Sequence, residues 1–218
     1  MSLGGSVIVP DKIDIKFLKK FKKIIEKFVK KGYKFVIICG GGKLARNFQK
    51  AASKYKFSNE DLDWLGIYAT RVNANFVKKL FGNIAEDVVV NNPASKIKFN
   101  KKILIAAGWK PGWSTDYDAV LLAKNLKVKT MINMSNIDYV YDKDPKKFKN
   151  AKKINNISWK EFRKITGSKW KVGLNMPFDA VAAKEAEKLR LKVIVIGKNL
   201  RNFESLLNDN GFEGTVIK

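Results

Sequence analysis

The chain has 218 residues, 45% of them hydrophobic, so it can bury one substantial core and form one or two domains. It contains no histidine, which excludes Ser-His and Cys-His catalysis, histidine-ligated zinc and histidine acid–base chemistry. No run of eighteen apolar residues occurs, so no membrane span is expected. The single cysteine, Cys39, and an N-terminus without signal-peptide character predict a cytoplasmic protein.

The formal net charge of +24 has two interpretations. A cationic surface is typical of proteins that bind nucleic acid, because it releases counterions from a phosphate backbone. However, the excess is nearly all lysine, it is spread along the chain, and no groove-binding helix or RNA-stacking motif accompanies it. We therefore interpret the charge as a lysine-solvated surface and do not expect nucleic acid as a partner, although the field would attract anionic nucleotides.

In the first half of the chain, apolar residues recur at helical spacing from Phe17 to Val29, and Gly32 is a plausible stop. Residues 35–39 predict a buried strand that opens into three glycines, followed by a helix from about Lys43. Ser58 or Asn59 can cap a longer helix that continues to about Leu80.

In the second half, residues 103–107 predict a strand that runs into a loop at 108–116, followed by a helix over 118–126 and a strand over 128–133. Residues 135–157 are polar and turn-like, and Ser158 with Glu161 forms a capping box for a short helix. A helix over 179–189, a strand over 192–196, a helix over 200–207 and an edge strand over 214–217 complete the pattern.

This alternation predicts an α/β fold, a three-layer αβα sandwich around a largely parallel central sheet. We expect a single domain with two lobes, residues 1–120 and 121–218, that meet near Val120.

Four polar or glycine-rich turns each follow an apolar strand, at residues 4–6, 40–42, 108–116 and 135–138. In open α/β sheets, ligands bind beyond the carboxyl ends of strands, where such turns converge. Glycines let main-chain N–H groups approach phosphate closely. None of the turns matches the Walker pattern or the G-x-G-x-x-G dinucleotide pattern, so a P-loop fold and a Rossmann dehydrogenase are disfavoured.

Several motifs, in order along the whole chain, resemble the amino acid kinase superfamily, and within it the archaeal type of uridylate (UMP) kinase. They are GGS at 4–6, GGGKLAR at 40–46, DWLG at 63–66, TRVN at 70–73, PGWSTD at 111–116, NIDYVYDKDP at 136–145 and PFDA at 177–180. The resemblance implies phosphoryl transfer from ATP, with Mg²⁺ carried by the nucleotide and no metal site of the protein's own, to UMP in pyrimidine nucleotide biosynthesis. It also implies a homo-oligomer, a hexamer built from dimers.

The resemblance further implies an N-terminal lobe that binds UMP, a C-terminal lobe that binds ATP, and the following roles. For ATP they are Gly5, Ser6, Gly42, Arg46, Ser135, Tyr141 and Asp144. For UMP they are Gly41, Asp63, Lys110, Pro111, Gly112, Trp113, Ser114, Thr115 and Asp116. For catalysis they are Lys43, Arg46 and Asp179.

Each role has a simpler alternative: Arg46 as a solvent-facing helix residue, Asp63 as a first-turn helix charge, and Asp179 as an ordinary helix cap. Many superfamily members carry a lysine where this chain has Ser2, so the cation that neutralises the transferring group is unassigned, and Lys43 is our candidate. Three other functions stay open: a kinase acting on another acceptor such as isopentenyl phosphate, a lysine-rich nucleic-acid-binding protein, and an inactive relative of the fold.

Overall fold

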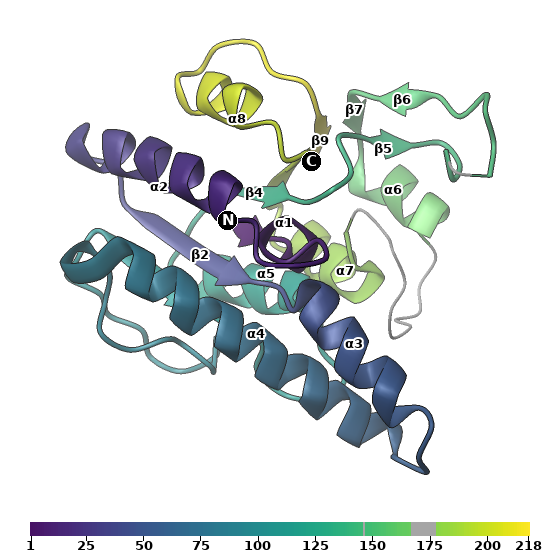
Figure 1. Cartoon of the computed structure of the whole chain (residues 1–218). Coiled ribbons are helices and arrows are strands. Elements are labelled where there is room, and N and C mark those ends of the chain that lie inside the picture. The colour runs from purple at the N-terminus through teal and green to yellow at the C-terminus, as the bar shows by residue number, and fades with distance from the viewer. Residues whose placement is uncertain (146, 167–177) are drawn as a thin grey trace.

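The computed structural model describes residues 1–145, 147–166 and 178–218, and its centre is a seven-stranded sheet (Figure 1). The sheet has the order β3-β2-β1-β4-β8-β9-β7, and β5 and β6 form a separate antiparallel pair. Five neighbouring strands, from β3 to β8, run parallel. The strands are β1 (Ser2–Leu3), β2 (Phe35–Cys39), β3 (Ile103–Ala106), β4 (Thr130–Met134), β5 (Val140–Tyr141), β6 (Lys153–Ile154), β7 (Asn156–Ile157), β8 (Lys192–Ile196) and β9 (Thr215–Ile217).

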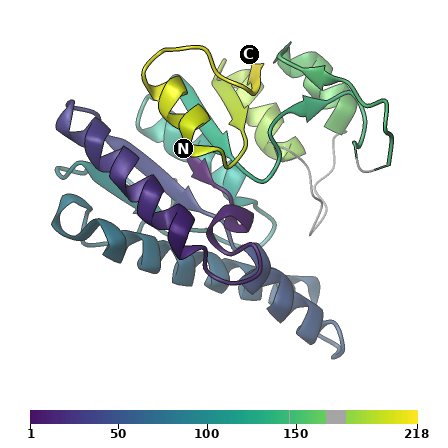
Figure 2. The same ribbon diagram turned by 45° about the horizontal axis from the view of Figure 1, so that its top comes forward.

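Helices cover both faces of the sheet, and Figure 2 shows the layers from a second direction. One face packs against α2, α4 and α8, and the other packs against α5, α6 and α7. This is the predicted three-layer sandwich. The helices are α1 (Gly5–Ile8), α2 (Ile15–Lys30), α3 (Gly42–Ala52), α4 (Asn59–Phe81), the 3₁₀ turn η1 (Gly82–Ile84), α5 (Thr115–Asn125), α6 (Trp159–Thr166), α7 (Ala180–Lys188) and α8 (Leu200–Leu207).

The sheet divides the core because side chains alternate along each strand. Ile37 and Cys39 of β2 point to the α2 side, whereas Ile38 points to the α5 side. On the α2 side, the ring of Phe21 stacks on Phe203 of α8 and meets Phe81 of α4 edge-on.

Side-chain caps set several helix starts as the sequence predicts. Ser58 and Asp61 form a reciprocal capping box at α4, and Ser158 and Glu161 do the same at α6. The Ser114 hydroxyl accepts the Tyr117 N–H, so α5 begins at Thr115, three residues earlier than predicted.

The structure corrects the predicted position of the last strand, at residues 214–217. β9 was predicted at an edge, but it lies between β8, to which it is antiparallel, and β7, to which it is parallel. β7 lies within the segment that was predicted to be only turn-like. It pairs with β9 and takes the edge position, because the Asn155 carbonyl accepts the Val216 N–H and the Ile157 carbonyl accepts the Lys218 N–H.

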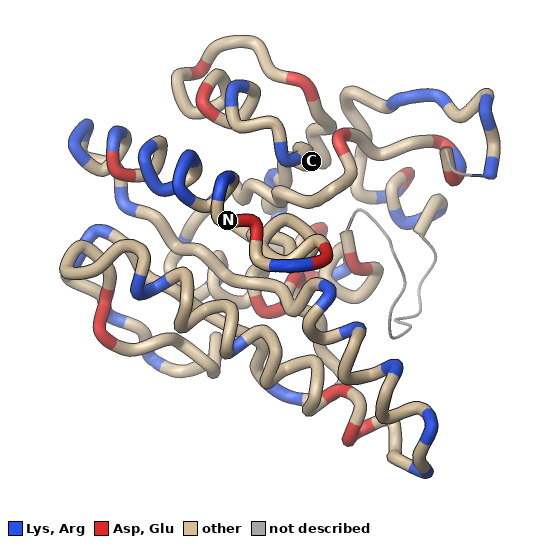
Figure 3. Tube along the Cα trace, in the orientation of Figure 1, with Lys and Arg blue, Asp and Glu red and all other residues tan. Residues whose placement is uncertain are grey.

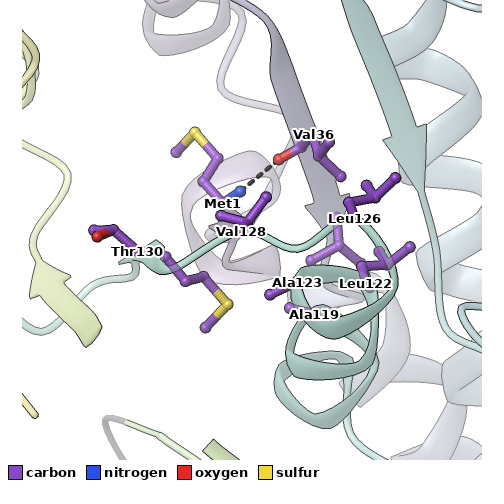
Figure 4. A pocket seen from close by; sticks show the side chains of 10 residues that line it. Met1, Val36, Ala119, Leu122, Ala123, Leu126, Val128 and Thr130 are labelled. Atoms are coloured by element: carbon purple, nitrogen blue, oxygen red, sulfur yellow. Dashed lines mark hydrogen bonds between the residues drawn. The ribbon is translucent and has the colours of Figure 1, made fainter. Parts of the chain in front are cut away.

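A small apolar pocket lies beside the N-terminus, between β2, β4 and α5 (Figure 4). The Met1 amino group is buried there and donates a hydrogen bond to the Val36 carbonyl, and burial lowers the pKa of this amino group to about 5. Leu122, Leu126 and Val128 line the far side. An apolar lining suits packing side chains rather than nucleotide phosphates.

Lysine and arginine are distributed over most of the described elements, as Figure 3 shows, and α2 carries lysines along its length. This distribution agrees with a solvated surface. Within the described ranges, no helix is long and apolar enough to cross a membrane.

Candidate active site

The predicted turns meet at one edge of the sheet. Because β1, β2, β3, β4 and β8 are mutually parallel, their carboxyl ends share this edge. Here the 4–6 turn contacts both the 40–42 turn and the start of the 135–138 turn, since the Gly4 N–H donates to the Met134 carbonyl at 2.8 Å. The turns therefore form one continuous surface rather than separate ones.

The first two turns are interlocked main chain to main chain. A Cβ atom at Gly5 would lie 1.9 Å from the Gly42 nitrogen and 2.6 Å from the Gly41 carbonyl carbon. Gly42 has φ +63°, a conformation that L side chains rarely adopt. Glycine is required at both positions because the two backbones touch, and α3 starts directly from this contact with Gly41 as its N-cap.

Buried polar side chains of α4 hold the second turn. The Asn73 amide nitrogen donates to the Gly40 carbonyl at 2.8 Å and to the Gly41 carbonyl at 3.1 Å. Asn73 and Thr70 are both buried, and the Thr70 hydroxyl accepts the Gly108 N–H at 2.8 Å. One helix thus positions both the 40–42 turn and the beginning of the 108–116 loop.

Three main-chain N–H groups of the 108–116 loop donate hydrogen bonds to side chains. Besides the Gly108 contact, the Trp109 N–H donates to Asp118 Oδ2 at 3.0 Å and the Gly112 N–H donates to Asp63 Oδ2 at 2.8 Å. Asp63 was predicted to bind the acceptor ribose, and here it also fixes the loop predicted to surround the acceptor. A carboxylate has acceptor capacity for both roles.

The other predicted loop residues lie around this contact. Lys110 and Gly112 are exposed, and Pro111, Trp113 and Thr115 are half-buried. The Trp113 ring stacks on Tyr117 with centroids 4.2 Å apart, and the Lys110 ammonium lies 4.2 Å from the Trp109 ring centroid. Ser114 is the cap of α5.

Lys43 and Arg46 lie in the first turns of α3, beside the interlocked glycines. Arg46 is exposed and Lys43 is half-buried, and neither forms an ion pair within the described part of the chain. α3 packs along α4, and Gln49 donates to the Leu62 carbonyl at 3.1 Å next to Asp63. Arg46 and Asp63 therefore lie on two helices, α3 and α4, that pack against each other (Figure 1).

Asp116 and Asp179, which the sequence places far apart, meet where β1, α5 and α7 converge. Asp116 Oδ2 accepts the Asp179 N–H at 3.3 Å, and Asp116 Oδ1 accepts the Ser2 hydroxyl at 3.2 Å. Burial, followed by the neighbouring Asp179 charge, raises the pKa of Asp116 to about 7. Burial also raises the pKa of Asp179, which caps α7 by accepting the Ala182 N–H. Both carboxyl groups therefore favour the neutral form more than an exposed carboxyl group does.

Among the predicted ATP residues, Ser135 adjoins the 4–6 turn, because a Cβ atom at Gly4 would lie 3.3 Å from the Ser135 Cα. Ser6 is in α1, and the Ser135 N–H donates to the Ile196 carbonyl at 3.0 Å, which brings the ends of β4 and β8 together. Tyr141 is half-buried in β5 and Asp144 is exposed. Pro177, part of the PFDA motif, lies outside the described residues.

Sequence reasoning missed four residues at this edge. Thr70, Arg71 and Asn73 belong to a motif quoted without roles, and Asp118 was treated as an ordinary helix residue. It also missed that Gly197 adjoins Asp138, where a Cβ atom would lie 1.6 Å from Asp138 Oδ1. The sequence signal that could have identified the α4 residues was the presence of polar residues on the apolar face of that helix.

Within the described ranges, no group of three or more aspartate, glutamate, cysteine or histidine residues could hold a metal ion. The main-chain amides and the basic side chains at this edge suit anionic ligands instead.

Comparison with known proteins agrees with this architecture. The amino acid kinase family model matches residues 1–197. Uridylate kinase of Thermococcus sibiricus is 36% identical over 90% of this chain and 88% of its own length, and that of Thermoplasma acidophilum is 34% identical over 100% and 95%. The crystal structure of uridylate kinase from Archaeoglobus fulgidus superposes with a TM-score of 0.85 at 32% identity, covering 100% of this chain and 98% of that one.

Fold and edge together define an αβα sandwich in which glycine turns from separate parts of the chain meet at one edge of the sheet. The chain belongs to the amino acid kinase family, in the group of the archaeal uridylate kinases, as the sequence motifs indicated.

Proposed function

We propose that this protein is a UMP kinase, which transfers the γ-phosphoryl group of ATP to UMP and yields UDP and ADP. The observation that carries the proposal is the interlock of Gly5 with Gly42, which joins the 4–6 turn, assigned to ATP, to the 40–42 turn, in which Gly41 is assigned to UMP. Two relatives that are 36% and 34% identical to this chain, from Thermococcus sibiricus and Thermoplasma acidophilum, are named uridylate kinase, which supports the same activity here. Isopentenyl phosphate transfer and nucleic-acid binding are not favoured.

The reaction requires alignment and charge neutralisation rather than a general base, because the UMP phosphate is already ionised at neutral pH. We assign the ATP phosphates to the main chain of Gly5, Ser6 and Gly42, and the γ-phosphoryl charge to Lys43 and Arg46. Mg²⁺ would enter with ATP and would neutralise part of the charge on its phosphate groups.

The remaining assignments follow the sequence predictions. Asp63 and the 110–116 segment bind UMP, and Asp179 orients the transfer through Asp116. Ser135, Tyr141 and Asp144 hold ATP, so that residues 1–120 contribute mainly the acceptor side and residues 121–218 the rest of the donor side. The lone, buried Cys39 suits a cytoplasmic location.

We also propose a homo-oligomer, with the hexamer as the specific expectation. Tyr68 and Val72 on α4 are 54% and 59% exposed, which leaves an apolar strip on the helix that carries Asp63. Light scattering of the wild type and of Tyr68→Glu tests this: we expect the wild type above the 24.7 kDa of one chain and a smaller assembly for the variant. A monomeric wild type would refute it.

The direct test of function is ADP release with ATP and a panel of acceptors: UMP, dUMP, CMP and isopentenyl phosphate. We expect the highest kcat/KM with UMP. Nucleotide binding without turnover would identify an inactive relative, and turnover of isopentenyl phosphate alone would identify a different acceptor.

A further inference from the structure

Arg71 and Asp118 hold the main chain of Trp109, in the acceptor loop, on both sides of its Cα atom. Asp118 Oδ2, on α5, accepts the Trp109 N–H at 3.0 Å, and Arg71 Nη2, on α4, donates to the Trp109 carbonyl at 3.0 Å. The Trp109 residue is therefore bound through its donor and its acceptor by two side chains, a carboxyl group and a guanidinium group, from different helices.

Both side chains are themselves tightly placed. The Arg71 guanidinium lies 5.7 Å from the ring centroid of Trp64 and 5.8 Å from that of Tyr68, and these two rings are stacked on each other. Asp118 is fully buried. Such supports keep a side chain in one rotamer and transmit that order to the group it holds.

The arrangement of Arg71 and Asp118 lowers the stability of the fold. Within the described residues, Asp118 Oδ1 and Arg71 Nε are the two buried side-chain atoms without a hydrogen-bond partner. Leaving a buried polar atom unpaired costs stability, and an aliphatic residue of similar size at position 118 would avoid that cost. The pair instead maintains the course of the loop between Gly108 and Lys110.

We propose that Arg71 and Asp118 are positioning residues for acceptor binding: together they clamp the main-chain N–H and C=O of Trp109, and this fixes the segment from Lys110 to Asp116 against the acceptor. The inference rests on the proposed function of this loop as the UMP-binding element. Thr70 and Asp63 hold the neighbouring Gly108 and Gly112 N–H groups, so the Trp109 clamp is the central one of three attachments.

Steady-state kinetics of Asp118→Ala, Asp118→Asn and Arg71→Lys test the clamp. Asp118→Ala should raise the KM for UMP by about tenfold and leave the KM for ATP within about twofold, because one charge-assisted hydrogen bond is lost on the acceptor side alone. Asp118→Asn should recover most of the UMP affinity, since its amide oxygen can accept the same N–H.

Arg71→Lys provides a second, independent variant if Asp118→Ala does not fold. Lysine keeps the positive charge of Arg71. It lacks the planar guanidinium that reaches the Trp109 carbonyl while lying against the Trp64 and Tyr68 rings. The KM for UMP should therefore rise by about fivefold. The matched controls are Asp87→Ala, in an exposed ion pair with Lys101, and Arg201→Lys, exposed on α8; both should behave as the wild type.

The outcomes separate the clamp from simple structural support. A structural role alone would raise both KM values and lower thermal stability together, with alanine and asparagine equally harmful at 118; that result overturns the clamp. Unchanged UMP kinetics in folded Asp118→Ala and Arg71→Lys also overturn it while the proposed function stands. A wild type that neither binds nor phosphorylates UMP overturns both.

Discussion

The two sides of the site are built in different ways. On the acceptor side, side chains of α4 and α5 hold the main chain of the 108–116 loop, through Thr70, Asp118 and Asp63. On the donor side, main chain meets main chain: Gly5 lies against Gly42, and Gly4 donates to the Met134 carbonyl. The acceptor side should therefore be sensitive to losing side-chain atoms, and the donor side to gaining them.

The largest effect is expected from adding one methyl group on the donor side. Gly5→Ala would place Cβ 1.9 Å from the Gly42 nitrogen, where only backbone could move aside. We expect loss of activity and destabilisation of at least about 3 kcal/mol, measured by chemical unfolding. Gly211→Ala, where Cβ would meet nothing within 4 Å, is the matched control and should be neutral. A stable, active Gly5→Ala would show that the turns do not touch in solution.

Removing a basic side chain at the junction of the two sides should slow turnover without unfolding. Arg46→Ala and Lys43→Ala each remove a donor for the transferring phosphoryl group, which we expect to cost about 3 kcal/mol of barrier, or roughly 100-fold in kcat. Lys50→Ala, exposed further along the same helix, is the control. If kcat is unchanged in either site variant, that residue does not contact the transferring group.

The third prediction concerns how the buried carboxyl group of Asp118, on the acceptor side, makes the free energy of unfolding depend on pH. Burial, ahead of the nearby Asp116 charge, raises the pKa of Asp118 from 3.8 to about 7. Between these values the folded protein retains a proton that the unfolded chain releases, so stability falls as pH rises through this window and the loss is complete above pH 7. Asp118→Asn removes this titration.

Unfolding free energies measured from pH 4 to pH 8 should therefore diverge, with Asp118→Asn gaining about 2 kcal/mol over the wild type by pH 8. The variant must be compared with the wild type because a second group titrates in the same range. Burial lowers the pKa of the Met1 amino group from 8.0 to about 5, so this group makes the free energy of unfolding rise with pH between these two values. A constant difference across the whole range would show that Asp118 titrates normally.

The smallest effect is expected at the N-cap of α4, which supports the acceptor side from outside the site. Ser58→Ala removes the capping box of α4, the helix that carries Asp63, Thr70 and Arg71, and should cost about 1 kcal/mol of stability. Activity at moderate temperature should not change, because the cap is exposed and lies at the helix start. Ser53→Ala, which loses one exposed hydrogen bond to the Lys50 carbonyl, should cost less. Equal losses would mean that the cap has no special role.

The sequence predicted local structure and turn placement well, because apolar periodicity and caps act over a few residues. β2, β8 and the start of α4 lie where predicted. The meeting of the glycine turns was also predictable, since strand ends in a parallel sheet share one edge.

Contacts between distant residues were not predictable. Asp118 resembles any polar residue near a helix start until the fold places it under Trp109, and Arg71 binds the same residue from another helix 38 positions away in sequence. Likewise, Asp116 and Asp179 become neighbours only when α5 and α7 pack together. The internal position of β9 depends on pairing with β7, a two-residue strand too short to show a pattern.

The central claim is that a single site holds donor and acceptor end to end across the Gly5–Gly42 contact. Calorimetric titration with a bisubstrate ligand, adenosine and uridine joined through five phosphates, tests it most directly. We predict one ligand bound per chain, displaced by either ATP or UMP, and no binding to Gly5→Ala. Two ligands per chain, or displacement by only one of the two nucleotides, would contradict a shared site.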